Sequence, residues 1–443
     1  MASGAAAVPV IADAWESHPV RKLSLYFCLA TLFLRLSVLP ELIAYITHVN
    51  TYLLYLAAPP AILSALLMGS VRRTFQARAA YYWAAFFAWM VLAIPFSSWP
   101  GGSAGAVLSY ARVDVIFLVL IGGAALNWKE VRAIFRTIAV AAVVNLASTR
   151  LFEAGTDGRV GLQASGSIGN SNDLAAQLLL VLPFLAFFML GRGRSIIVRI
   201  AVWGLLLYGF WIVLGTASRG ALVGLTVVFL GILFHVSLPK KVALLALGVF
   251  LALAAITLLP ASARARLGSM FGGKHEEAAE SAESRQYLLK TSLKFTIQHP
   301  IFGVGPDQFG SYEGKTSRSQ GLHGNWHATH CAYTQVSSEC GVPGFVFFVA
   351  GLGSAILLVS RTYRMARREG FLEIANGCFC YLLAMLGYLV ALIFLSQAYS
   401  FTLPSMVGLA IALSAGARRT IEANRDSQVP LPAEPAPRSS VRR

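Results

Sequence analysis

The chain alternates between long apolar runs and short polar gaps over most of its length. Because a helix needs about 20 mostly apolar residues to cross a bilayer, this pattern predicts about twelve spanning helices. They are expected near residues 24–46, 50–70, 79–98, 107–126, 136–152, 172–191, 200–215, 220–237, 242–260, 342–360, 372–396 and 399–416. The predicted fold class is therefore an all-α polytopic membrane protein.

One polar gap is much longer than the others and separates the ninth predicted span from the tenth. Within it, Leu289, Leu293 and Ile297 recur every four residues, which predicts an amphipathic helix that ends before Pro300 and suits a membrane surface. The acidic stretch 274–283 before it is expected to be flexible. The predicted organisation is spans one to nine in 1–260, a mainly helical loop subdomain in 261–341, spans ten to twelve in 342–417, and a disordered tail in 418–443.

Composition supports a membrane protein, and the position of the charges gives its orientation. Hydrophobic residues make up 56% of the chain, and the mean hydropathy is +0.65. The net charge of +16 does not indicate a nucleic-acid partner, because the basic residues form clusters in every second gap, as in cytoplasmic loops. Both termini are thus predicted to be cytoplasmic and the long loop to lie on the other side of the membrane.

The five cysteines are predicted to be free thiols. Cys28, Cys378 and Cys380 lie in apolar runs and are expected to be buried small hydrophobic residues. Cys331 and Cys340 are nine positions apart, which would place them on opposite faces of one helix and prevent a disulfide between them.

The residues best suited to chemistry lie at the end of the long loop, where His323, His327 and His330 precede the tenth span. No helix breaker occurs from Ala328 to Cys340, and Gly341 then gives a stop signal, so a short helix is expected to hold His330 at the membrane surface. An imidazole there can accept a proton near neutral pH.

Two arginines are expected on the same side of the membrane. Arg219 lies in a short turn between two apolar runs, and Arg285 lies at the start of the amphipathic helix. Guanidinium groups pair with two phosphate oxygens at once, so these arginines and a histidine fit transfer from a lipid pyrophosphate.

Each of these residues also has a simpler interpretation. Arg219 fits a span-end anchor equally well, and Arg285 fits a solvated helix face with Glu280 or Glu283. The spacing of His327 and His330 lacks the glutamate of the H-E-x-x-H zinc motif, so no zinc site is expected.

In combination, these segments resemble the O-antigen ligase family, which also holds O-antigen polymerases and protein O-oligosaccharyltransferases. The resemblance covers roughly residues 150–400. It rests on RVGLQASGSIGNSNDLAAQ (159–177), GTASRGALVGL (215–225), SRQYLLKTSLKFTIQHPIFGVGPDQF (284–309), and His330 followed by Cys331, nine residues and Gly341-Val342-Pro343-Gly344, which is similar to the family pattern H-[NSQ]-x9-G-x-x-G.

The resemblance implies a metal- and cofactor-independent glycosyltransferase at the periplasmic face of a bacterial inner membrane. Its partners would be an undecaprenyl-pyrophosphate-linked glycan as donor, lipid A-core as acceptor, and the membrane lipid around it. His330 would be the general base, and Arg219 and Arg285 would bind the pyrophosphate. Arg159, His323 and His327 are lesser candidates. Independently of the family, Asp157, Asp173 and Asp307 are isolated in the sequence, so no carboxylate pair for a metal is apparent.

The acceptor stays open at this point. Cys331 replaces the amide or hydroxyl residue of the family pattern, and its S–H is a weak donor. A polysaccharide polymerase or a protein O-oligosaccharyltransferase would use the same donor. A membrane transporter is the alternative from another class, with Arg35, Arg112 and Asp114 in or near spans as its candidate path.

Overall fold

The computed structural model describes residues 19–151, 159–161, 168, 170–190, 195–258, 264, 268, 276–321, 324 and 326–426. The described part of the chain is helical, without a strand. Its helices are α2 (Pro19–Leu36), α3 (Leu39–Thr47), α4 (Leu53–Leu67), α5 (Ser70–Thr74), α6 (Arg78–Ala93), α7 (Pro100–Tyr110), α8 (Ile116–Gly122), α9 (Trp128–Leu151), α10 (Ser171–Leu190), α11 (Ile196–Gly215), α12 (Arg219–His235), α13 (Leu238–Leu258), α15 (Glu276–Gln298), α16 (Phe309–Ser319), α17 (Ala332–Arg368), α18 (Leu372–Ala391) and α19 (Thr402–Asp426). Short 3-10 segments follow α6 and α18, and a π-helical turn, Ala111–Val115, joins α7 to α8.

Each predicted span corresponds to one or more helices, but the predicted number of about twelve spans is not confirmed. Among the described residues, 7 helices are long and apolar enough to cross a membrane, and up to 8 if α2 and α3, which meet at 64°, form one broken span. The helices α4 and α12 are apolar but shorter. The all-α membrane architecture stands, and the full number of crossings stays a prediction.

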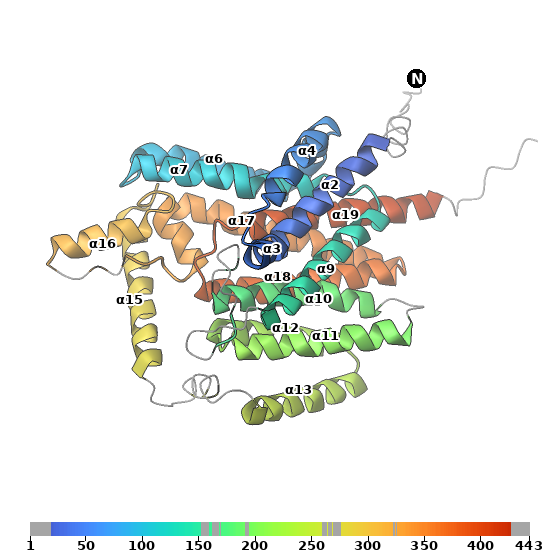
Figure 1. The fold of residues 1–443 in the computed structure, drawn as a ribbon. Helices are drawn as coiled ribbons and strands as arrows, with labels where there is room; N and C mark the ends of the chain where they lie inside the picture. The colour runs from blue at the N-terminus through green and yellow to red at the C-terminus, as the bar shows by residue number, and fades with distance from the viewer. Residues whose placement is uncertain are drawn as a thin grey trace, which may run out of the picture.

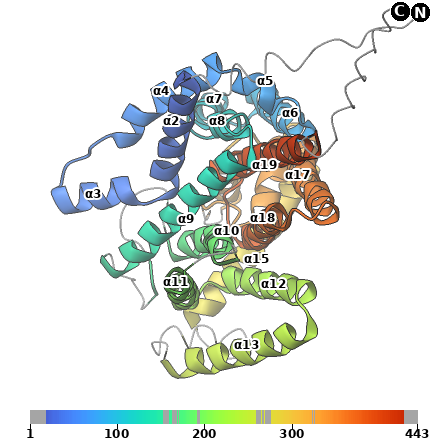
Figure 2. The same ribbon diagram turned by 90° about the vertical axis from the view of Figure 1, so that its right-hand side faces the viewer.

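The long apolar helices form a bundle with a common axis, and α15 runs across one end of it (Figure 1). At the centre, α17 packs against α6, α18 and α19, and α10 packs against α18. Figure 2 shows α13 at the periphery, beyond α11 and α12. Large aromatic side chains fill the core, and Trp83, Phe86 and Phe348 are all fully buried in contact with one another.

The helix α17 contains a break where the sequence predicts a helix stop. Gly341 has φ 70° and ψ −175°, so the first part of α17 ends at Cys340 and the span begins after it. Pro343 has no N–H to donate to the Glu339 carbonyl four residues earlier, and that carbonyl instead accepts from the Gly305 N–H at 3.0 Å. The next carbonyl, that of Cys340, accepts a hydrogen bond from Trp89 Nε1 at 2.9 Å.

Two expectations about the loop subdomain and the tail are corrected. The helix α15 begins at Glu276, so most of the acidic stretch 274–283 is helical rather than flexible. The last helix, α19, continues to Asp426, so residues 418–426 are helical and are not part of a disordered tail. The rest of that predicted tail, 427–443, lies outside the described residues.

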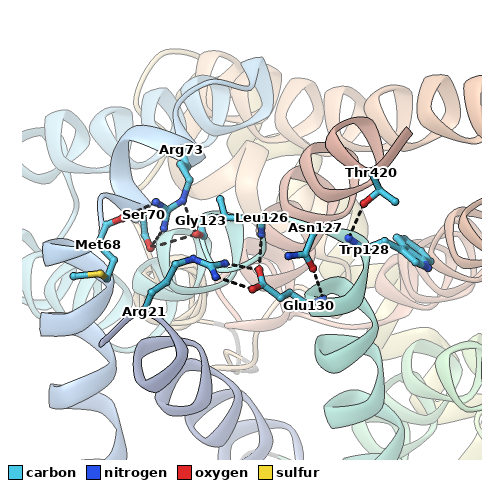
Figure 3. A network of polar contacts seen from close by, with 10 residues as sticks. All are labelled: Arg21, Met68, Ser70, Arg73, Gly123, Leu126, Asn127, Trp128, Glu130 and Thr420. Atoms are coloured by element: carbon cyan, nitrogen blue, oxygen red, sulfur yellow. Dashed lines mark hydrogen bonds and ion pairs between the residues drawn. The ribbon is translucent and has the colours of Figure 1, made fainter. Parts of the chain in front are cut away.

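Polar contacts join several helices at the end of the bundle opposite α15 (Figure 3). The Arg21 guanidinium of α2 forms a two-pronged ion pair with the Glu130 carboxylate of α9. Arg73 of α5 donates to the backbone oxygens of Met68 and Gly123. This is the end that carries the basic clusters and that the charge pattern predicts to be cytoplasmic.

Candidate functional site

His330 lies just before α17 and not on a helix. The helix starts at Ala332, so the expected start at Ala328 is wrong, and His330 adopts a left-handed conformation with φ 54°. Its backbone N–H donates to Ser396 Oγ at 2.6 Å. The neighbouring Thr329 is buried, and its hydroxyl donates to the Cys331 carbonyl at 2.9 Å. The peptide on both sides of His330 is thereby fixed against the end of α18.

Residues before His330 are positioned by one buried carboxylate. Glu313 of α16 is 1% exposed and accepts hydrogen bonds from the Tyr287 hydroxyl, the Ser317 hydroxyl and the Trp326 N–H, at 3.1, 3.0 and 3.0 Å. These donors come from α15, α16 and the segment that leads to His330. A single side chain therefore holds the three parts of the loop subdomain together.

The turn that carries Arg219 is rigid. Ser218 is the N-cap of α12, with its Oγ accepting from the Ala221 N–H, and Arg219 is the first helical residue. Gly220 packs so closely on Phe394 that a Cβ there would lie 2.8 Å from that ring. The cap at Ser218 and the packing of Gly220 on Phe394 therefore hold the backbone of Arg219, which lies between them, in place.

Arg159 supports the same turn from a different segment. Its Nε donates to the Thr216 carbonyl at 2.8 Å, and its Nη2 donates to Asn172 Oδ1 at 2.9 Å. These contacts link the residues before α10 to the start of α12. These two hydrogen bonds give Arg159 a structural role, and its role in the reaction stays a prediction.

Arg285 comes to this turn from the loop subdomain. Its half-buried side chain lines a crevice with Asn172, Ser218 and Gly220, which places α15 against the ends of α10 and α12. The positive charge of Arg285 also acts on His330. Segments far apart in the sequence therefore meet at one end of the bundle.

The surroundings of His330 favour the neutral imidazole. Burial lowers its pKa from the ordinary value of 6.5, and the positive charges of Arg285 and His327 lower it further. His327 is exposed, with its ring centroid 6.4 Å from that of His330. A neutral imidazole at neutral pH is the form that can accept a proton.

A polar cavity of about 410 Å³ lies next to the His330 backbone, because Ser396 lines it. Uncharged groups dominate the lining, among them Gln335, Gln397 and Tyr399. Asp173 also lines it, and its carboxylate accepts a hydrogen bond from Gln397 Nε2 at 2.6 Å. Sites for hydroxyl-rich ligands are commonly built from such amides, hydroxyls and carboxylates.

The sequence did not reveal this cavity. Asp173 and Asp307 appear isolated along the chain, yet both line the cavity. Arg35 and Asp114 line it as well and form a partly buried ion pair at 3.5 Å. The only local hint was the polar SQAYS segment, 396–400, between the last two predicted spans.

The remaining predicted residues are placed as follows. His323 lies outside the described residues. All five cysteines are buried free thiols. Within the described ranges, no three His, Cys, Asp or Glu side chains are grouped as metal ligands would be. The expectation of a metal-independent reaction stays a prediction.

Comparison with known families identifies part of the chain. Residues 203–349 match the family model described as O-antigen ligase. The chain carries an O-antigen ligase family domain. No curated protein matches the chain significantly. The O-antigen ligase match runs from α11 into α17 and includes Arg219, Arg285 and His330, whereas Arg159 precedes it. Together with the apolar helices, the family indicates a multi-pass membrane protein.

Proposed function

We propose that the protein is a glycosyltransferase that moves a glycan from undecaprenyl pyrophosphate to lipid A-core at the periplasmic face of a bacterial inner membrane. The observation that carries this proposal is that Arg285 lines one crevice with Ser218 and Gly220, the two neighbours of Arg219, and lies close enough to His330 to lower the pKa of its imidazole. A pyrophosphate group bound by Arg219 and Arg285 would lie beside a neutral base.

In the proposed reaction, an acceptor hydroxyl oxygen attacks the anomeric carbon of the donor glycan. His330 takes the hydroxyl proton as the new glycosidic bond forms. The bond between the anomeric carbon and the pyrophosphate oxygen breaks, and undecaprenyl pyrophosphate leaves with the electron pair. Arg219 and Arg285 stabilise the negative charge that develops on the leaving group.

The polar cavity beside Ser396 supports a carbohydrate substrate. Its volume of about 410 Å³ is within the range of small-ligand sites, and its amides and carboxylates match the hydroxyl groups of sugars. A purely apolar lipid would leave those groups unpaired, at a cost of about 1–3 kcal/mol each. In the proposal, this cavity holds sugar residues of the substrates next to the base.

The decisive experiment is a transfer assay with purified protein, a lipid-linked glycan and lipid A-core. His330→Ala should reduce turnover by about 100-fold or more, since general bases contribute about 10²–10⁴. The matched control is His327→Ala, which removes an exposed imidazole three positions away and should retain most of the activity. Full activity of His330→Ala would rule out the proposed base, and no product from the wild type would favour a transporter.

The acceptor deserves its own test because Cys331 departs from the family pattern. This residue is the N-cap of α17, yet its side chain makes no capping hydrogen bond. A growing glycan or a protein hydroxyl would be activated by His330 in the same way. Deleting the gene and resolving the envelope glycans separates the cases: loss of long-chain lipopolysaccharide with polymer left on the carrier supports ligation to lipid A-core.

A further inference from the structure

A second large groove is lined in part by the end of α19. That end of α19 lies on the side of the bundle away from α15 and α16 (Figure 1). The volume of the groove is about 800 Å³, and its walls come from the start of α6, the second half of α17 and the end of α19. Along α17 it extends from Ala350 to Arg361, which is about 16 Å of helix at 1.5 Å per residue. It is separate from the candidate site, and no residue lines both.

The rim of the groove is strongly basic. Five arginines line it against one carboxylate, that of Glu422; they are Arg73, Arg78, Arg361, Arg418 and Arg419. Arg73 is held by backbone carbonyls of its own neighbourhood (Figure 3). Burial lowers the pKa of Arg73 to about 10, and the positive charges of Arg21 and Arg419 contribute to this lowering.

Among the described residues, the other four arginines form no ion pair with a carboxylate. In the described part of the chain, the arginines that form ion pairs with carboxylates are Arg21, Arg35, Arg132 and Arg425. None of these four lines the groove. Four guanidinium groups are therefore available to bind an anion from outside the protein. Guanidinium pairs with phosphate through two parallel hydrogen bonds.

Below the rim, the groove is apolar and open. Its wall includes Leu357, Leu358 and Ile411, and Leu357 is 55% exposed. A Cβ added at Gly353 would meet no atom within 4 Å, so the space in front of this glycine is empty. An apolar wall that continues into a basic rim matches the division of a phospholipid into acyl chain and phosphate.

We propose that this groove binds an anionic phospholipid, with its phosphate on Arg361, Arg418 and Arg419 and an acyl chain along Gly353 and Leu357. The lipid would come from the leaflet at the basic end of the bundle. A free phosphate would make no use of the apolar wall, and basic pockets between membrane helices on the positive side are suited to anionic headgroups.

The test uses purified full-length protein in a mild detergent, titrated with phosphatidylglycerol, with phosphatidylcholine and with inorganic phosphate. Binding is read by native mass spectrometry and by the rise in thermal unfolding temperature. Phosphatidylglycerol should bind at least about tenfold more tightly than phosphatidylcholine, because each arginine near a headgroup contributes about 1 kcal/mol.

Two variants locate the site. The triple variant Arg361→Gln, Arg418→Gln, Arg419→Gln should weaken phosphatidylglycerol binding by about tenfold or more. Its matched control is Arg199→Gln, Lys240→Gln, Lys241→Gln, which removes three charges from the starts of α11 and α13, outside the groove. Gly353→Leu fills the apolar part without removing charge and should also weaken binding, whereas Gly204→Leu, at an equally open position on α11, should not.

The outcomes decide the proposal. Equal losses in both triple variants would show a general attraction to basic surface and overturn it. Stabilisation by inorganic phosphate as strong as that by phosphatidylglycerol would show an anion site without lipid and would also overturn it. If Gly353→Leu binds phosphatidylglycerol as tightly as the wild type, the acyl chain does not lie along Gly353, and the proposed lipid site is wrong.

Discussion

At the scale of single residues, the backbone of His330 is the least expected feature of the site. A left-handed conformation is uncommon for residues other than glycine and costs about 1–3 kcal/mol, which contacts elsewhere must offset. Here the hydrogen bond from the His330 N–H to Ser396 and the turn made by Thr329 hold it. No local pattern in the sequence predicts this, because Ser396 lies 66 positions away.

The lowered pKa of His330 predicts the pH dependence of transfer. A general base works when deprotonated, so activity should persist at pH 7 and fall only as the pH drops through a value below 6.5. Replacing Arg285 with Gln removes a positive charge that lowers this pKa, so the acid limb should shift to higher pH in addition to any loss of rate. The rate is measured from pH 5 to 8 with saturating substrates.

A matched control for this shift is Lys290→Gln, which removes a positive charge from an exposed position on the same helix. Its acid limb should coincide with that of the wild type. An unshifted limb in Arg285→Gln would mean that Arg285 does not act on the base.

At the scale of elements, the segment 303–305 explains how α17 can be broken without leaving backbone groups unpaired. The Val304 and Gly305 N–H groups donate to the carbonyls of Ser338 and Glu339, at 2.8 and 3.0 Å, where the first part of α17 ends. The Glu339 carboxylate in turn accepts from the N–H of Phe309, the first residue of α16. The G-V-G segment therefore caps one helix and connects it to the next.

The break in α17 predicts that Gly341→Ala is destabilising. A Cβ there would lie 2.2 Å from the Ile301 carbonyl oxygen, and φ 70° is unfavourable for alanine. The expected loss is about 2 kcal/mol or more, seen as lower thermal stability of the purified protein. Gly353→Ala, in the same helix with open space around it, should be neutral or slightly stabilising. Equal stability of both variants would contradict the strained position.

The sequence predicted an amphipathic helix within α15 and placed its Leu289, Leu293 and Ile297 stripe at a membrane surface, but it did not indicate which face packs on the protein. Leu289 and Leu293 are exposed, at 40% and 47%, whereas Leu288 and Phe295 are buried against Phe309. Hydrophobic periodicity identifies apolar stripes on a helix, but it does not show which of two adjacent stripes packs against a segment that is distant in the sequence. The exposed stripe still fits the expected position at the membrane surface, because α15 runs across the end of the bundle (Figure 1).

Glu313 should be a positioning residue for the segment that leads to His330. The Glu313 carboxylate accepts hydrogen bonds from three donors, whereas the amide of Glu313→Gln has only one acceptor oxygen and adds N–H donors that find no acceptor there. The substitution should lower the free energy of unfolding by about 1–3 kcal/mol and lower activity. Thermal stability and transfer rate are measured together. Glu283→Gln, an exposed carboxylate on α15, should change neither. A stable, fully active Glu313→Gln would show that the three contacts are dispensable.

At the scale of the whole molecule, the sequence indicates where helices form better than how they meet. The apolar runs all became helices, since twenty apolar residues leave the backbone few other choices in a bilayer. The cavity could not be predicted in this way. Asp173 and Gln397, which meet there, are 224 positions apart, and only the packing of α10 against α18 brings them together. The positions of Arg219, Arg285 and His330 at span and helix ends made them candidates, but their roles came from the resemblance and their convergence is not encoded in any local pattern.

The orientation of the bundle gives the last prediction, because the described cysteines are buried and leave the surface free for labelling. Single cysteines at Val49 and Ser319 should react with a membrane-impermeant thiol reagent in intact cells with a permeabilised outer membrane. Cysteines at Arg72 and Lys240 should react only after lysis. The pair Val49 and Arg72 brackets the short helix α4, so labelling of both in intact cells would mean that α4 does not cross the membrane. Labelling of Lys240 in intact cells would exclude a crossing by α12, which is also short, and would change the predicted positions of the later spans.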